Sequence, residues 1–144
     1  MEPWFPTPAA SKLTGVSVKT LENWAQRGFL KASLADRPGP GGRRVYSFRD
    51  LIAIRVAASL RDRGIDVRHM KRVVEYLRKR KGLDLSAADV LASTLLVTDG
   101  HDVYEVDGNA RVSTLRHPDQ TALVVPLGRM VAKIRADAAH VYAA

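Results

Sequence analysis

Apolar side chains recur at steps of three and four residues in the stretch that follows Gly15. Val18, Leu21 and Ala25 have this spacing, which places them on one side of a helix and leaves polar side chains on the other. Gly15 can adopt the left-handed conformation that ends a preceding helix. The pattern therefore predicts two short helices joined by a turn, the second over residues 18–27.

The remaining helices are predicted from the same spacing and from residues that begin helices. Thr7, followed by a proline, marks the start of the first helix. Ser47, with Asp50 at the capping-box position, starts a third helix, and Asp66 starts a fourth. A last helix is expected after Pro126. Its apolar stripe consists of Leu127, Met130, Val131, Ile134, Ala138 and Val141.

Between these helices the pattern is interrupted or has a period of two. Residues 37–42 read RPGPGG, which can form neither a helix nor a central strand. Short apolar pieces flank this segment, Leu30 and Ala32 before it and Val45 and Tyr46 after it. We therefore expect a two-stranded hairpin with a flexible tip, which is a wing. The first six residues are expected to be a tether whose two aromatic side chains pack on the domain.

Up to four short strands are expected in the second half of the chain. They read TLLVT, DVYEV, RVSTL and TALVV, and turns containing Asp-Gly, Asp-Gly-Asn and His-Pro-Asp separate them. A short helix over residues 82–93 is expected before them. These elements predict a small β-meander with a terminal helix, so the expected fold class of the whole chain is α+β.

Charge divides the chain near residue 82. Residues 1–82 contain 18 Lys and Arg against 7 Asp and Glu, a net charge of +11, whereas residues 83–144 contain 5 against 8, a net charge of −3. A strongly basic half suits a polyanion. We therefore expect a DNA-binding domain at 1–82 and a dimerisation or partner-binding module at 83–144.

The sequence shows no arrangement typical of catalysis. The chain has no cysteine, its four histidines show no His-x-x-x-His spacing, and it has no glycine-rich phosphate loop. We therefore expect no enzyme activity, no catalytic residue, no cofactor and no metal site. No apolar run approaches the roughly 18 residues of a membrane span, and the N-terminus lacks the basic region of a signal peptide, so a cytoplasmic protein is expected.

The predicted helix at 18–27 and the predicted wing both carry groups that can contact DNA. Amides and cations on one helix face can bond base edges and phosphates in the major groove. Guanidinium groups in a wing suit phosphate or minor-groove contact, and the wing carries Arg37, Arg43 and Arg44. The polar face of the helix consists of Lys19, Thr20, Glu22, Asn23, Gln26 and Arg27.

Three pieces of sequence, in this order, resemble the DNA-binding domain of the MerR family of transcriptional regulators. They read LTGVSVKTLENWAQRGFL, GGRRVYSFRDL and IRVAASLRDRGIDVRHMKRVVEYL, and the resemblance covers about residues 7–80. It implies a winged helix-turn-helix with a second helix pair against the wing. The DNA contacts that it implies are Ser17, Lys19, Thr20 and Asn23 on the recognition helix and Arg43, Arg44 and Tyr46 on the wing.

The chain also departs from the family's pattern. Glu22, Asn23 and Trp24 stand where the recognition helix of the family usually reads Arg-Tyr-Tyr. The acid argues against phosphate contact at this position and favours a different reading of bases, and the tryptophan is expected to be partly buried. The wing loop is longer and richer in proline, and the long coiled-coil helix and cysteine effector sites are missing, so metal or redox sensing is not implied.

The sequence thus predicts a bacterial transcriptional regulator that binds double-stranded DNA as a homodimer on a two-fold symmetric operator. The alternative is the antitoxin of a toxin–antitoxin pair, which would bind DNA for autoregulation and its toxin through residues 83–144. A third option is a small ligand held by the sheet, but no group of residues identifies one. The terminal stripe is expected either to cover the sheet or to form the dimer interface. The interface residues would be Leu127, Met130, Val131, Ile134 and Val141.

Overall fold

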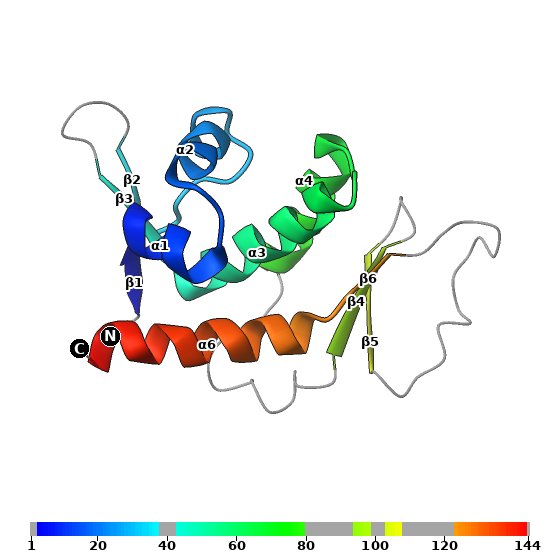
Figure 1. Cartoon of the computed structure of the whole chain (residues 1–144). Coiled ribbons are helices and arrows are strands. Elements are labelled where there is room, and N and C mark those ends of the chain that lie inside the picture. Colours follow the sequence, from blue (N-terminus) through cyan, green and yellow to red (C-terminus); the bar gives the residue numbers. More distant parts are fainter. Residues whose placement is uncertain (1–2, 38–42, 80–93, 99–102, 108–122, 144) are drawn as a thin grey trace.

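The computed structural model describes residues 3–37, 43–79, 94–98, 103–107 and 123–143, which adopt a mixed α+β fold (Figure 1). The helices of this part of the chain are α1 (Thr7–Thr14), α2 (Val18–Gln26), α3 (Phe48–Asp62), α4 (Val67–Lys79) and α6 (Leu127–Ala143). Its strands are β1 (Trp4–Pro6), β2 (Ala35–Asp36), β3 (Arg44–Ser47), β4 (Thr94–Thr98), β5 (Val103–Asp107) and β6 (Leu123–Val125). The strands form two antiparallel sheets, in the orders β1-β3-β2 and β5-β4-β6.

Several helix ends form as the sequence predicts. Gly15 follows the last residue of α1 with a φ of 76°, a conformation that costs glycine little. The Ser17 hydroxyl accepts a hydrogen bond from a backbone N–H of the first turn of α2. Ser47 and Asp50 form a complete capping box at α3, and the Asp66 carboxylate accepts a backbone N–H at the start of α4. These bonds satisfy N–H groups that have no partner inside their helices.

The N-terminal residues differ from the expected tether. Residues 4–6 form β1, which pairs with β3, and the side chain of Phe5 is buried in the core. Because β1 leads directly into α1, the N-cap position falls on Pro6 rather than on Thr7, and none of the described side chains caps this helix. The expectation that both aromatic residues pack on the domain is correct for Phe5, whereas Trp4 is 41% exposed.

The wing consists of β2 and β3, and its first strand begins later than predicted. Leu30 and Ala32 were expected in this strand but are buried in the hydrophobic core. The strand starts only after the chain has reached the surface at Ser33 and Leu34, which are exposed. The tip of the wing, residues 38–42, lies outside the described residues.

α3 lies at the centre of the fold and is buried around most of its circumference. The sequence predicted one buried side, but Ile52, Ala53 and Ala57 are buried as well. α1, α4, α6 and β3 all contact this helix, so its apolar residues meet a neighbour in nearly every direction. A helix that is apolar all round is a buried helix.

α6 packs against the first half of the chain, an arrangement that differs from both predicted ones. Leu127, Val131 and Ile134 belong to the same hydrophobic core as Phe5 and α3. α6 contacts α1 and α3 as well as β4, and Figure 1 shows it running along the side of these helices that faces away from α2. The stripe is therefore buried in its own chain, which leaves it neither free as a dimer interface nor restricted to the sheet. Met130 is partly buried, and the side chain of Val141 lies outside the described part.

The strand order of the second sheet differs from that of the expected meander. β4 is its central strand, with β5 on one side and β6 on the other, whereas a meander would place β6 at the far end. This order brings the chain back beside β4 and directly into α6, which then reaches α3. The guanidinium of Arg63 joins the two halves again, because it donates a 2.7 Å hydrogen bond to the carbonyl oxygen of Val124. The predicted helix at 82–93 and the RVSTL strand lie outside the described residues.

Candidate DNA interface

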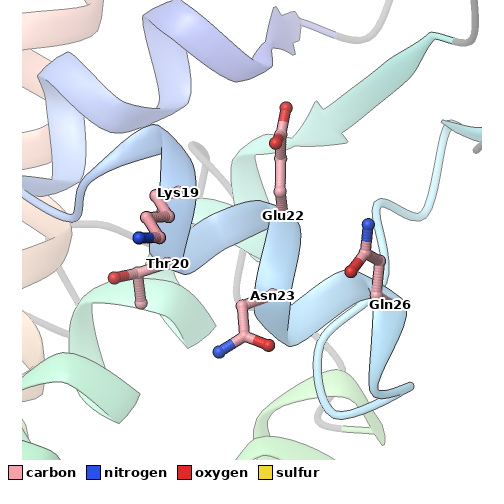
Figure 2. A pocket seen from close by; sticks show the side chains of 5 residues that line it. All are labelled: Lys19, Thr20, Glu22, Asn23 and Gln26. Atoms are coloured by element: carbon pink, nitrogen blue, oxygen red, sulfur yellow. The ribbon is translucent and has the colours of Figure 1, made fainter. Parts of the chain in front are cut away.

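α2 turns a polar face to the outside of the molecule. Its apolar side chains, Leu21, Trp24 and Ala25, are buried. The opposite side chains line one open hollow on this helix, and Figure 2 shows them projecting from it: Lys19, Thr20, Glu22, Asn23 and Gln26. In Figure 1, α2 and the wing lie on one side of α1 and α3, and α6 lies on the other. The sequence therefore predicted the polar face of α2 correctly, and it placed Leu21 and Ala25 correctly on the buried side.

Hydrogen bonds between Ser17 and Thr20 fix the first turn of α2. The Ser17 Oγ accepts the backbone N–H of Thr20 at 3.1 Å and donates to the Thr20 Oγ1 at 2.9 Å. The hydrogen of the Ser17 hydroxyl is thus used inside the chain, whereas the Thr20 hydroxyl keeps its own hydrogen for an external acceptor. Val18 was assigned to the apolar stripe but is exposed, because it begins the helix at the molecular surface.

The three arginines of the wing have different surroundings. The Arg44 Nε donates to the Asp36 Oδ1 at 2.9 Å, and the Arg44 side chain is only 11% exposed. Arg44 faces Asp36 across the β2–β3 pair, so this charge is already neutralised within the wing. Arg37 and Arg43 are exposed, and the Arg43 guanidinium lies over the Trp4 ring, 5.8 Å from its centroid. Arg37 and Arg43 are therefore the wing cations available to a phosphate.

Tyr46 does not reach the surface. Its side chain is 0% exposed, and its hydroxyl oxygen is buried with no hydrogen-bond partner among the described residues. Burial raises the pKa of Tyr46 above its ordinary value of 10.0; the Arg44 charge opposes this shift, and three carboxylates add to it. The DNA contact that the family resemblance implied for Tyr46 is therefore wrong for this conformation, because the ring occupies the core.

Trp24 and Arg27, in and after the last turn of α2, differ in their exposure to solvent. Trp24 is buried and meets the Phe29 ring edge-on at 5.2 Å between centroids. The Arg61 guanidinium lies over the Trp24 ring, 5.7 Å from its centroid. Trp24 is thus more deeply buried than the sequence predicted. Arg27 occupies the C-cap position, and its side chain is exposed. The cation of Arg27 therefore stands at the end of the polar face.

A buried acid that sequence reasoning treated only as a cap fixes the wing and α4 relative to α3. The Asp50 carboxylate accepts the backbone N–H of Ser33 at 2.8 Å, the Ser33 hydroxyl at 2.7 Å and the backbone N–H of Ser47 at 2.9 Å. The Arg78 guanidinium lies 3.6 Å from the same carboxylate and donates to the backbone oxygen of Lys31. The charge of Arg78, on α4, thus lies at this junction. The signal in the sequence was an acid at a capping position within an apolar helix.

A helix-turn-helix with an uncovered polar second helix, beside a hairpin with exposed arginines, defines a winged DNA-binding domain. The particular family follows from the sequence match: residues 5–77 match the family described as MerR HTH family regulatory protein. The chain belongs to this family, whose members are transcriptional regulators and not enzymes. The resemblance inferred from the three sequence pieces is thus confirmed.

Mycobacterial proteins share part of this sequence. The chain is 32% identical over 98 residues to the uncharacterized HTH-type transcriptional regulators Rv1830 of Mycobacterium tuberculosis and Mb1861 of Mycobacterium bovis. The match covers 68% of this chain but only 41% of each relative.

Among the described residues, no helix has the length and apolar character needed to cross a membrane.

Proposed function

We propose that this protein regulates transcription by binding a two-fold symmetric operator as a homodimer. Each α2 would enter a major groove, and each wing would contact the flanking backbone. One domain of this size buries too little surface for tight specific binding, so two half-sites are needed.

The observation that carries the proposal is the uncovered polar face of α2 on the same side of the molecule as the wing. Lys19, Thr20 and Asn23 stand on this face (Figure 2), while α6 occupies the opposite side of the fold (Figure 1). The net charge of +11 in residues 1–82 supports the same conclusion, because phosphate neutralisation supplies most of the affinity of such domains.

The side chains have separate roles in this proposal. Asn23 carries an amide that can bond the N6 and N7 atoms of an adenine together. Lys19 and Arg27 flank it as phosphate ligands, and Arg37 and Arg43 extend the contact along the backbone next to the wing. Thr20 supplies a hydroxyl donor to the same groove.

The dimer contact belongs, in this proposal, to a part of the 83–144 module other than the α6 stripe. Leu127, Val131 and Ile134 are already buried against α1 and α3. Exposing them to form a dimer would remove apolar cover from the domain that binds DNA. Residues 83–144 carry a net charge of −3. We expect the second copy of the chain to bind on the surface of this module outside the α6 stripe.

Sedimentation of the full chain with and without DNA, followed by footprinting on a selected fragment, tests this function. We expect a dimer that protects two half-sites about one helical turn apart. The logarithm of its affinity should fall with the logarithm of salt concentration by about 0.9 per phosphate neutralised. A chain that stays monomeric at tens of micromolar and binds one asymmetric site tightly would contradict the dimer, and binding that is independent of salt would contradict the interface.

A further inference from the structure

The polar face of α2 consists of two rows of side chains with different chemistry. Residues four positions apart lie one above the other on a helix, so Lys19 and Asn23 form one row and Glu22 and Gln26 form the other. Figure 2 shows Glu22 and Gln26 projecting together, away from Asn23 and Thr20. The first row combines a cation with an amide. The second row combines a carboxylate with an amide and contains no cation.

Glu22 is the central residue of α2 and its carboxylate is exposed. With the residues that the structure describes, it forms neither an ion pair nor a hydrogen bond, although Lys19 stands one turn earlier on the same helix. Its negative charge therefore faces the DNA side without an ion-pair partner among the described residues. Close to a phosphate such a charge would be repelled, so the backbone cannot be what this side chain binds.

An ionised carboxylate only accepts hydrogen bonds, which limits the bases that it can contact. In the major groove, guanine and thymine present acceptors, and adenine presents a donor next to an acceptor. Cytosine presents the N4 amino group, a donor that has no acceptor of its own base beside it, and Glu or Asp is its usual partner.

We propose that Glu22 reads a cytosine through its N4 amino group, so that the operator carries a C·G pair beneath the centre of each α2. This inference rests on the proposed function, because it requires α2 to lie in the major groove. Glu22 then discriminates between DNA sequences in two ways. It forms a hydrogen bond with the correct base, and it lowers the affinity for sequences in which no donor faces its carboxylate. Asn23, in the other row, contacts a different base pair.

Selection of duplexes from a random library by the full-length protein, followed by competition at one salt concentration, tests the proposal. We expect a cytosine at one fixed position in each half-site. Replacing that cytosine by 2-pyrimidinone, which lacks only the N4 amino group, should weaken binding about 5- to 150-fold. Glu22→Ala, which removes both acceptor oxygens and the charge, should lose most of this penalty and bind random duplex more tightly than the wild type.

A matched control is Glu75→Ala, which makes the same truncation at an exposed glutamate on α4. It should raise affinity for all duplexes alike and leave the cytosine preference unchanged. If Glu22→Ala behaves like Glu75→Ala, with the selected sequence and the 2-pyrimidinone penalty unaltered, Glu22 does not read a base and the proposal is overturned. If the wild type binds no duplex at all, the proposed function itself fails, which is a different result from tight binding without a cytosine.

Discussion

α2 and α6 are both amphipathic helices that pack on one hydrophobic core, but they lie on opposite sides of it and differ in their outer faces. The outer face of α2 offers a hydroxyl, two amides, a carboxylate and a lysine, on the same side of the molecule as the wing (Figure 1). On the outer face of α6, Lys133 pairs with Asp137 at 3.2 Å, so part of its charge is already balanced. The comparison shows that a buried stripe identifies the side of a helix that faces the core. The role of the helix then depends on the chemistry of its other side and on what lies beside it.

The largest effect is expected where α6 enters the shared core. Ile134→Asp should destabilise the whole fold by more than about 4 kcal/mol, since loss of a buried isoleucine side chain alone costs about 2–5 kcal/mol and the carboxylate adds a desolvation penalty. Trp24 on α2 reports unfolding of the distant face, and in a Trp4→Phe background it is the only tryptophan. Urea unfolding followed by its fluorescence should show the loss.

The control for that experiment is Ala132→Asp, which places the same acid on the exposed side of α6. It should change stability by about 1 kcal/mol or less, the range of helix propensity and surface effects. If Ile134→Asp left the unfolding of Trp24 unchanged, α2 and α6 would not share a core, and the contrast between the two helices would lose its basis.

A smaller effect is expected at Asp50, which holds the wing and α4 against α3. Asp50→Ala leaves the buried N–H of Ser47 and the partly buried donors of Ser33 without this acceptor, which costs about 1–3 kcal/mol. Asp50→Asn keeps one acceptor oxygen and should lose less. Thermal unfolding monitored by circular dichroism compares the two variants. Equal stability of Asp50→Ala and the wild type would show that the junction contributes nothing.

The smallest effect on stability, and a clear one on DNA binding, is expected from the two adjacent wing arginines. Arg43→Ala should reduce the salt slope of binding by about 1, because it removes a cation free to meet a phosphate. Arg44→Ala should leave the slope nearly unchanged and reduce stability by about 0.2–1 kcal/mol, the usual worth of a cross-strand pair. Affinities measured across a series of salt concentrations distinguish the two, and identical slopes for both variants would contradict the assignment.

The sequence was sufficient for local features that depend on neighbouring residues. The Ser17 cap, the Ser47–Asp50 capping box and the buried and exposed sides of α2 all depend on groups within a few positions of each other. The sequence could not supply partners that lie far away along the chain. Nothing near Ile134 indicates that its neighbours are α1 and α3, and only the pairing of β6 with β4 brings it there.

The candidate site shows the same limit. The family resemblance identified Arg43 and Arg44 in the wing, but it could not distinguish Arg43, which is exposed, from Arg44, which pairs with Asp36. It also could not show that Tyr46 is buried, because an aromatic residue in a strand suits a core and an interface equally well. Alternation along β3 does not separate the two, since Tyr46 and Ser47 are both buried.

The most direct test of the central claim, that the exposed face of α2 reads DNA bases, is the affinity of Asn23→Ala for a selected operator and for random duplex at the same salt concentration. Asn23 is exposed and projects from α2 into the open hollow of Figure 2. We predict a loss of about 1–3 kcal/mol on the operator and little change on random duplex, because an amide contributes by bonding one particular base. Equal losses on both duplexes would contradict base reading by this face.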